Sequence, residues 1–126
     1  KCVLNLVKNP TGANEVMKVI EEDQDDKTVL LVLNDHAQDG TDVSWIYDTF
    51  FEKLVNEKTV HIICSGTRCY DMALRLKYAG YKERIEVEEN LEKAVASLKN
   101  ADTTMYAIAT YTALQPVRKL LRRNEK

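Results

Sequence analysis

The chain has 126 residues, 44% of them hydrophobic, which is enough for one domain with one buried core. Its 18 basic and 20 acidic residues give a formal charge of −2, which argues against nucleic acid or an anionic membrane as a partner. No apolar stretch approaches the roughly 20 residues of a membrane-spanning helix, and the N-terminus has no signal-peptide pattern. We therefore expect a single cytoplasmic domain over residues 1–126, without a transmembrane segment.

The start of the sequence favours a longer parent chain. Lys1 stands where an initiator methionine would be, and residues 2–7 already have the apolar pattern of a strand. A domain excised from a longer protein would begin in this way, so we expect a fragment.

The first part of the chain predicts a strand, a turn and a helix. The apolar residues 2–7 run into the turn-forming sequence Asn9-Pro10-Thr11-Gly12. Apolar residues then recur with helical spacing, and Asn14 is expected to cap this helix with its side-chain oxygen. The acidic run at residues 21–26 is typical of a solvated turn.

An acidic and aromatic segment follows the next strand. Residues 28–33 form a continuous apolar run, which indicates a strand covered on both faces. The segment from Leu33 to Glu52 then contains four aspartates, one of the two histidines and the only tryptophan. Within it, residues 43–47 are expected to form a short strand and residues 50–55 to open a helix. Carboxylates crowded beside aromatic side chains are costly in a plain loop, so the segment is expected to have a function.

A further strand–helix–strand pattern occupies the middle of the chain. Residues 59–64 are a second fully apolar strand, and the turn Ser65-Gly66-Thr67 follows it. A helix is expected over residues 70–78, with Gly80 as its end. Residues 84–87 indicate a weaker strand.

The last part of the chain predicts two helices around one strand. Asn90 is expected to cap the first of these helices. The strand is expected over residues 103–112, and Pro116 stands where the first turn of a closing helix tolerates proline. Basic residues on this helix suit the C-terminal end of its dipole.

Strands that alternate with helices predict right-handed βαβ units on a mainly parallel sheet. The expected fold is a three-layer, Rossmann-like α/β domain. In such sheets ligands bind beyond the carboxyl ends of the strands. Three loops of this chain occupy that edge, residues 8–14, 34–42 and 65–68.

These loops contain only parts of a phosphate site. Neither G-x-x-x-x-G-K-[ST] nor G-x-G-x-x-G is present, so the chain has no complete nucleotide cradle. Residues 9–12 and 65–68 each pair turn residues with hydrogen-bond donors, and Arg68 has the fork to hold a phosphate or carboxylate. The alternative is that both are ordinary turns and that Arg68 is a surface ion-pair partner.

The sequence contains no complete catalytic pair. A lone aspartate can bind a metal, act as a general base or orient a catalytic histidine. Cys69 at a helix start would have a dipole that favours the thiolate, but nothing places His36 or His61 beside it. His61 and Cys64 have no second ligand pair, so a metal site is not expected. The three cysteines are expected to be reduced and buried.

Four stretches, in this order along the chain, resemble one known family. They are LVKNPTGANEV (residues 6–16), LND (33–35) with DGTDVSWIYD (39–48), SGTR (65–68) with YDMALRLKYAG (70–80), and TYTAL (110–114). Together they resemble the C-terminal domain of the MurT family, the Mur ligase-like subunits of lipid II isoglutaminyl synthase. The resemblance covers nearly the whole chain and implies a Mur ligase C-terminal type of Rossmann-like fold.

The resemblance also implies an activity. In that family the ligase subunit and a glutamine amidotransferase subunit form a heterodimer that amidates the D-glutamate α-carboxyl of lipid II to D-isoglutamine. This is a carbon–nitrogen ligase reaction of bacterial peptidoglycan and cell-wall synthesis, with glutamine as the amide donor and ATP as the activator. The family's phosphate-binding loop, magnesium ligands and Cys₄ zinc ribbon belong to a central domain that is absent here. ATP, magnesium and zinc would therefore be bound mainly elsewhere, and this domain alone should be inactive.

Site residues follow from the resemblance in two groups. In related Mur ligases the loop after the first strand closes over ATP, which here implies Lys8, Asn9, Thr11, Gly12 and Asn14, together with Arg68. Lys8 stands where the related loops have an acidic residue or histidine.

The second group concerns the partner. The family's ligase subunit lends an aspartate to the partner's Cys–His pair, which implies Asp42, with Asp48 and Asp39 as alternates. Trp45, Tyr47 and Phe50 are candidate interface anchors, although core packing is equally open for Trp45.

A function of a different class is a free-standing Rossmann-like binding or scaffold module without catalysis. The two hypotheses differ in whether the reading frame extends upstream into a phosphate-binding loop and a Cys₄ domain.

Overall fold

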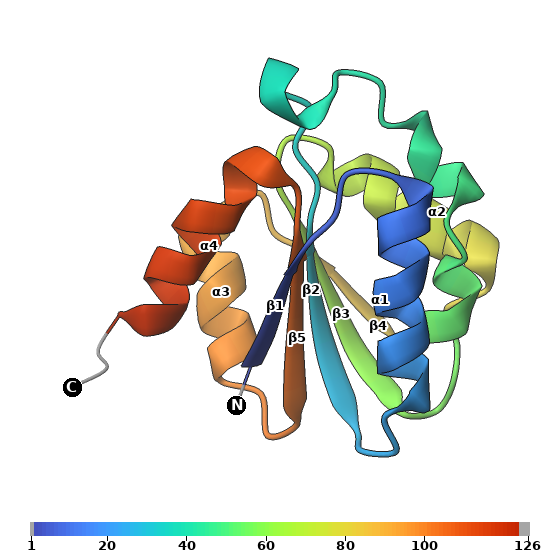
Figure 1. Cartoon of the computed structure of the whole chain (residues 1–126). Coiled ribbons are helices and arrows are strands. Elements are labelled where there is room, and N and C mark those ends of the chain that lie inside the picture. The colour runs from blue at the N-terminus through green and yellow to red at the C-terminus, as the bar shows by residue number, and fades with distance from the viewer. Residues whose placement is uncertain (1, 124–126) are drawn as a thin grey trace.

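A five-stranded, all-parallel sheet forms the middle layer of the protein, in the order β1-β5-β2-β3-β4 (Figure 1). The computed structural model describes residues 2–123. The strands are β1 (Cys2–Leu6), β2 (Lys27–Val32), β3 (Thr59–Ser65), β4 (Arg84–Val87) and β5 (Thr104–Ala109). The α/β prediction with a mainly parallel sheet is confirmed. The expectation drawn from Lys1 concerns a residue outside the described range.

Helices cover both faces of this sheet, each over its own hydrophobic core. Helices α1 (Pro10–Glu22) and α2 (Cys69–Ala79) pack on one face, around Met17, Phe51 and Leu76. Helices α3 (Leu91–Lys99) and α4 (Tyr111–Arg122) pack on the other, around Val95 and Val117 (Figure 1). Because both faces are covered, every residue of β2 is buried, as its continuous apolar run predicted.

Several local predictions are confirmed. Helix α2 ends at Gly80, which adopts the left-handed conformation with φ of 94°. The weaker strand β4 has the expected bounds. The Asn90 side chain caps α3 by accepting a hydrogen bond from the Lys93 N–H.

The start of α1 differs from the prediction. The helix begins at Pro10, and Asn9 is its cap, because the Asn9 Oδ1 accepts the Gly12 N–H at 2.9 Å. Proline suits the first helical position, since its fixed φ is helical and it needs no partner for an N–H. The prediction that Asn14 caps this helix was wrong. Asn14 lies inside α1, and its Oδ1 accepts the Phe50 N–H at 2.7 Å.

The start of α4 also differs. The last strand ends at Ala109 instead of Thr112, and α4 begins at Tyr111, so Pro116 lies inside the helix and not in its first turn. Proline has no N–H, so the helical hydrogen bond from residue 116 to the Thr112 carbonyl is missing. A distant carboxylate, Asp39, accepts the Thr112 N–H in the first turn of this helix and so stabilises its start.

The acidic and aromatic segment contains short helical turns where a strand was expected. They are the 3₁₀ helices η1 (Ala37–Asp39), η2 (Ser44–Asp48) and η3 (Phe51–Leu54). The prediction of a strand at residues 43–47 was wrong, and the helix expected at residues 50–55 is a single 3₁₀ turn. The turns η2 and η3 pack beside α1 and α2, whereas η1 contacts the start of α4.

No helix within residues 2–123 has the length and apolar character needed to cross a bilayer.

Candidate functional site

The loops expected at the carboxyl edge of the sheet are joined there by main-chain hydrogen bonds. The Leu33 N–H donates to the Ser65 carbonyl at 3.0 Å, and the Arg68 N–H donates back to the Leu33 carbonyl at 2.9 Å. The Thr110 N–H donates to the Val32 carbonyl at 3.1 Å. The segments after β2, β3 and β5 therefore form one connected unit.

Asn34 is the hub of this unit. Its Oδ1 accepts the Thr67 N–H at 2.9 Å, and its Nδ2 donates to the Thr112 Oγ1 at 3.0 Å. Its own N–H donates to the Thr110 Oγ1, also at 3.0 Å. One side chain thus links the loops after three neighbouring strands, which restricts their relative movement.

Gly66 allows the β3 loop to approach β2 closely. Its φ is 95°, and a Cβ at this position would lie 2.5 Å from the Leu33 carbonyl oxygen and 2.8 Å from the Asn34 Oδ1. Both neighbours are held by the hydrogen bonds described above. A side chain here would separate the two loops.

The Gly66→Ala substitution is expected to lower the free energy of unfolding by at least about 2 kcal/mol, because it combines an unfavourable backbone conformation with a clash against main chain. Urea denaturation measures the change. Gly40→Ala is the matched control, since Gly40 has a similar φ of 89° but no atom within 4 Å of the place where a Cβ would stand. Equal losses in the two variants would contradict a role for close packing at Gly66.

Asp39 is buried, with 8% of its surface exposed, and both of its carboxylate oxygens accept hydrogen bonds. Oδ1 accepts the Thr112 N–H at 2.7 Å, and Oδ2 accepts the Thr112 hydroxyl at 2.5 Å. Oδ2 also accepts the His36 N–H at 3.2 Å. This alternate for the cross-subunit role is therefore engaged within its own chain.

Asp35 and Arg68 form an ion pair at the same edge. The Arg68 Nη1 lies 3.1 Å from the Asp35 Oδ2, and the Arg68 Nε lies 2.6 Å from the Asp71 Oδ2. The Thr67 hydroxyl donates to the Asp35 Oδ1 at 2.9 Å. The Thr67 hydrogen bond, followed by the Arg68 contact, lowers the pKa of the Asp35 carboxyl. Arg68 thus serves as an ion-pair partner here, and an added anion would compete with two carboxylates.

Asp42 and Asp48 are exposed on the segment that follows. The Asp42 Oδ1 accepts the Ser44 N–H at 2.9 Å, and this bond lowers the pKa of the Asp42 carboxyl. Asp42 is therefore an ionised, solvent-facing carboxylate that the Ser44 N–H orients locally.

The loop before α1 presents a partly open helix N-terminus. Lys8, Asn9, Thr11 and Gly12 are exposed, and the Asn9 side chain satisfies the Gly12 N–H. Lys8 adds a positive charge beside this N-terminus, which suits contact with a phosphate. Asn14 differs from the other four, because it is half-buried and its Oδ1 is occupied by the Phe50 N–H.

Arg75 holds the acidic and aromatic segment against α2. Its side chain is buried, its Nε donates to the Ile46 carbonyl at 2.8 Å, and its Nη2 donates to the Thr49 carbonyl at 2.7 Å. Nη2 also lies 3.0 Å from the Glu52 Oε1. The guanidinium carbon stands 5.7 Å from the centre of the Tyr47 ring.

Large apolar side chains are exposed beside this anchor. Along α2, residues 70, 74 and 78 recur at the four-residue spacing of one helix face. The Tyr78 ring makes an edge contact with the Tyr47 ring, with centroids 6.1 Å apart. We call this group the aromatic surface; its members, with their exposed fractions, are Tyr47 (50%), Tyr70 (64%), Leu74 (49%) and Tyr78 (73%).

The candidate anchors differ in exposure. Phe50, which is 58% exposed, and Tyr47 are open to a partner, as the interface hypothesis requires. Trp45 is only partly exposed and packs against the core, so the core-packing alternative holds for this residue.

The described residues contain no activated thiol. Cys2, Cys64 and Cys69 are free, and burial raises the pKa of the Cys64 thiol to about 12. Burial also raises the pKa of the Cys69 thiol, so the expectation of a thiolate favoured by the helix dipole was wrong. The His61 Nε2 lies 3.2 Å from the Glu86 Oε1 and not beside a cysteine. Within residues 2–123, no three His, Cys, Asp or Glu residues are placed to hold a metal ion.

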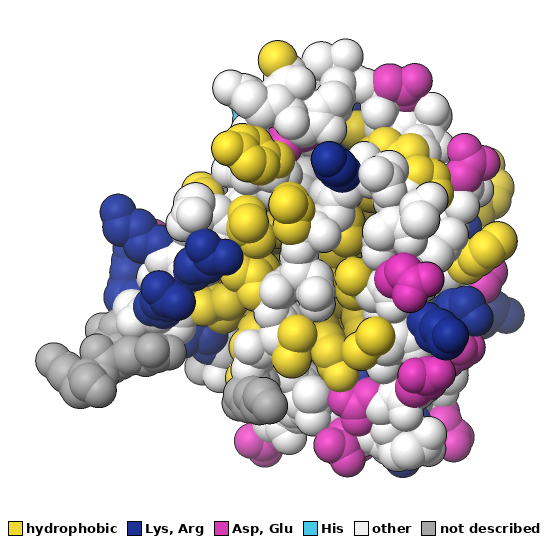
Figure 2. Space-filling model, in the orientation of Figure 1, with side chains coloured by type: hydrophobic (Ala, Val, Ile, Leu, Met, Phe, Trp, Pro, Cys, Tyr) yellow, Lys and Arg dark blue, Asp and Glu magenta, His cyan; other side chains and the backbone are white. Residues whose placement is uncertain are grey.

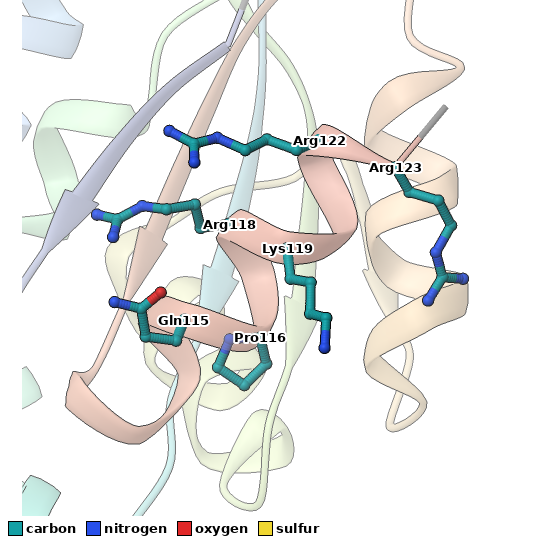
Figure 3. A pocket seen from close by; sticks show the side chains of 6 residues that line it. All are labelled: Gln115, Pro116, Arg118, Lys119, Arg122 and Arg123. Carbon is teal, nitrogen blue, oxygen red and sulfur yellow. The ribbon is translucent and has the colours of Figure 1, made fainter. Parts of the chain in front are cut away.

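Two hollows differ in their relation to the carboxyl edge. A cleft of about 420 Å³ lies at the edge itself, lined by Asn34, His36, Gly66, Thr67 and Glu89 among others. A larger, open groove of about 850 Å³ runs along α4, where Arg118 and Arg122 extend in the same direction (Figure 3). Figure 2 shows exposed hydrophobic side chains beside the basic side chains of this region. Only the smaller cleft lies among the loops described above.

Sequence reasoning missed three of the residues that build this edge. Arg75 was given no role from the sequence, although it lies among Met72, Ala73 and Leu76, which are buried. Asn34 and Asp35 were placed at this edge within residues 34–42 and noted as part of a family motif, but neither was given a role of its own. Their position directly after a fully apolar strand was a usable signal, because parallel strands direct such residues to the ligand-binding edge.

Comparison with known proteins identifies relatives over most of the chain. Residues 6–114 match a family model described as MurT ligase C-terminal. The chain is 40% identical over 124 residues, 98% of its length, to "Lipid II isoglutaminyl synthase (glutamine-hydrolyzing) subunit MurT" of Staphylococcus aureus (strain COL). It is 36% identical over 123 residues, 96% of its length, to the subunit of the same name from Streptococcus pneumoniae (strain ATCC BAA-255 / R6). The chain spans 28% of the length of each of these relatives.

A solved structure has a similar fold. The crystal structure of the UDP-N-acetylmuramate–alanine ligase MurC from Thermotoga maritima superposes with a TM-score of 0.61 at 9% sequence identity. The match covers 97% of this chain and 26% of that one. At this identity the similarity supports the fold alone.

Proposed function

Because the chain belongs to the MurT ligase C-terminal family, we propose that it is one domain of an ATP-dependent ligase subunit that works with a glutamine amidotransferase. The complex would amidate the D-glutamate α-carboxyl of lipid II to D-isoglutamine, with glutamine as the amide donor. The name of the relatives supports this proposal, since it describes a synthase subunit and a glutamine-hydrolysing reaction. Residues 1–126 would make up one Mur ligase C-terminal-like domain of a longer, cytoplasmic chain.

The buried thiols are the observation that best supports a separate glutaminase. Glutamine hydrolysis by covalent catalysis needs an accessible nucleophile with a nearby base. Cys64 and Cys69 are buried with raised pKa values, and neither is paired with a histidine in the described part of the chain. A nucleophile on a partner subunit agrees with this arrangement.

ATP and magnesium would be held mainly by another domain of the ligase subunit. The first turn of α1 fits a contact with a nucleotide phosphate, because Lys8, Asn9, Thr11 and Gly12 are exposed at a helix N-terminus. When bound, ATP supplies the phosphoryl group that converts the substrate carboxylate to an acyl phosphate, which ammonia attacks. The role of the α1 loop would be to bind and orient, with Asn9 fixing the helix start. Asn14 would act indirectly, by holding the turn at Phe50. Arg68 would bind a nucleotide phosphate only after releasing its carboxylate partners, Asp35 and Asp71.

An aspartate of this domain would orient the histidine of the partner's Cys–His pair. Such a carboxylate accepts the histidine Nδ1–H, fixes the tautomer and stabilises the imidazolium. Asp42 remains the first candidate and Asp48 an alternate, because both carboxylates face solvent. Asp39 is less suited, since both of its oxygens are engaged. Asp35 is a second candidate on geometric grounds, because Thr67 and Arg68 hold its carboxylate in place at the edge of the sheet.

The experiment for this proposal uses the full ligase subunit, with and without residues 1–126, expressed together with the amidotransferase. The intact subunit is expected to purify with its partner and to transfer amide nitrogen from ¹⁵N-glutamine to lipid II only when ATP is present. The truncated subunit should lose the partner and the transfer. Full transfer by the truncated subunit would contradict the proposal, and partner binding without any transfer would favour the scaffold alternative.

The aromatic surface is the proposed docking area for the amidotransferase, because it adjoins the segment that carries Asp42 and Asp48. The Tyr47→Ala/Tyr78→Ala double variant is expected to weaken the complex at least about 10-fold, since buried tyrosines contribute strongly to interfaces. Surface plasmon resonance or analytical ultracentrifugation measures the affinity.

Tyr111→Ala is the control for this variant, because Tyr111 is 59% exposed but lies on α4, on the other face of the sheet. An affinity loss as large for Tyr111→Ala as for the double variant would place the interface elsewhere.

A further inference from the structure

Asp39 occupies the place where open α/β sheets most often bind a ligand. The connection from β2 to β3 packs its later turns, η2 and η3, on the face covered by α1 and α2, whereas the neighbouring strand β5 leads into α4 on the other face. Loops that diverge in this way open a crevice at the carboxyl ends of the two strands. The first turn of α4 faces this crevice, and an N–H group of this turn could donate a hydrogen bond to an anion bound there.

In this chain the anion is part of the protein. The Asp39 carboxylate accepts both the N–H and the hydroxyl of Thr112, at 2.7 and 2.5 Å, and is 8% exposed. A hydrogen bond from a main-chain N–H at a helix N-terminus to a carboxylate is of the strong, charge-assisted kind. The crevice is therefore closed by a bond from the β2 loop to α4.

The loop after β2 is thus attached to α4 at two points, in addition to the bonds of Asp35 with Thr67 and Arg68. Asn34 binds Thr67 and Thr112 at its beginning, and Asp39 binds Thr112 near its end. Asp35 lies between the two points. Thr112 serves both, since its hydroxyl accepts from Asn34 and donates to Asp39.

We propose that Asp39 is a positioning residue, whose bond to α4 fixes the direction in which the β2 loop presents Asp35 and Asp42 to the partner's histidine. This inference rests on the proposed cross-subunit triad. Asp39 itself does not contact the reacting atoms. Its effect is to hold the orienting carboxylate where the partner's imidazole N–H meets it.

A purely structural role would predict a different result. If Asp39 contributed only stability, its loss would reduce the amount of folded subunit but leave the turnover of each assembled complex unchanged. A positioning role predicts a lower kcat with an unchanged KM for glutamine, because glutamine binds to the partner subunit. It also predicts a lower pKa for the partner's histidine, because a displaced carboxylate stabilises the imidazolium less.

The test uses the assembled complex of the full ligase subunit and the amidotransferase, with Asp39→Ala and Asp39→Asn. Asp39→Ala is expected to lower the kcat for glutamine hydrolysis about 10–100-fold, since small displacements of a catalytic group have effects of this size. The acid limb of the pH–rate profile should move to lower pH. Asp39→Asn should lower the kcat less, because the Oδ1 of the asparagine still accepts the Thr112 N–H. If Asp39→Ala does not fold, the kcat and acid limb of Asp39→Asn provide the test.

Tyr81→Phe is the matched control. The buried Tyr81 hydroxyl donates to the Thr59 carbonyl at 2.7 Å, at the start of β3 and so at the opposite edge of the sheet. This variant also loses a buried hydrogen bond, but its kcat and acid limb should match those of the wild type.

The outcomes separate this inference from the proposed triad. If Asp35→Asn or Asp42→Asn lowers hydrolysis while both Asp39 variants keep the wild-type kcat and acid limb, the positioning role is overturned and the triad stands. If neither Asp35→Asn nor Asp42→Asn changes hydrolysis, the triad is overturned, and the positioning role falls with it. An equal loss of kcat in Asp39→Ala and Tyr81→Phe would show that Asp39 has only a structural role.

Discussion

Glutamine hydrolysis by the assembled complex is expected to fall about 10³–10⁴-fold when the orienting aspartate is changed to asparagine. The amide keeps the shape of the side chain but loses the charge, so the partner's histidine is held in the wrong tautomer and its imidazolium is not stabilised. Initial rates of glutamate release measure the loss. Size-exclusion chromatography should show that the variant subunit still assembles with its partner.

Two aspartates compete for this role on different grounds. Asp42 is exposed, and the Ser44 N–H orients its carboxylate locally. Asp35 is half-buried and held by Thr67 and Arg68. Asp42→Asn and Asp35→Asn, measured side by side, assign the role to the variant with the larger loss. Unchanged hydrolysis in both would contradict a cross-subunit triad based on either residue.

The pH dependence adds a second criterion. Hydrogen bonds lower the pKa of both carboxyls, so each is ionised at neutral pH and remains so on mild acidification. The acid limb of hydrolysis should therefore follow the partner's histidine and not the aspartate. Asp102→Asn is a suitable control for the Asp35 and Asp42 variants. Asp102 is exposed just before β5, at the amino edge of the sheet and so at the opposite edge from these two aspartates.

The Arg75→Met substitution is expected to lower the free energy of unfolding by about 3 kcal/mol or more. Methionine keeps most of the apolar stem but removes the donors to the Ile46 and Thr49 carbonyls. Each carbonyl would keep only its main-chain partner, the Thr49 N–H for Ile46 and the Phe51 N–H for Thr49, and would lose a charge-assisted bond in a poorly hydrated place. Urea denaturation followed by circular dichroism measures the change.

Lys77→Met is the matched control for stability, because Lys77 is exposed on the same helix and its loss should change the free energy of unfolding by less than about 0.5 kcal/mol.

In the complex, Arg75→Met should also weaken partner binding, since Arg75 supports Tyr47 and the segment that carries Asp42. A stability loss in Arg75→Met no larger than in Lys77→Met would show that the segment is held by other contacts.

Local sequence predicted the elements whose structure depends on local chemistry. The apolar run of β2 identified a strand buried on both faces, and Gly80 and Asn90 marked a helix end and a helix start. These signals are local because a cap or a left-handed turn is built from residues within about one turn of each other. The alternation of strands and helices then gave the parallel sheet, and with it the edge at which the loops meet.

The candidate site was predictable in place but not in detail. That residues 34–42 and 65–68 lie at the carboxyl edge follows from the parallel topology. The topology does not tell which aspartate side chain is available to a partner. Asp39, for example, is bonded to Thr112, a residue 73 positions away in sequence. The same bond stabilises the first turn of α4, which begins at Tyr111 and not after Thr112, so Pro116 lies inside the helix.

The segment from residue 43 to residue 54 shows most clearly where prediction from the sequence fails. Its β-branched and aromatic residues favour a strand, yet it forms 3₁₀ turns because its carbonyls bond to Arg75 and the Phe50 N–H bonds to Asn14. Sequence alone established the fold class, the family resemblance and the edge where function is expected, since these depend on periodicity and short motifs. The folded chain settled which carboxylates are engaged and which remain available, since hydrogen bonds between distant segments leave no periodic signal in the sequence.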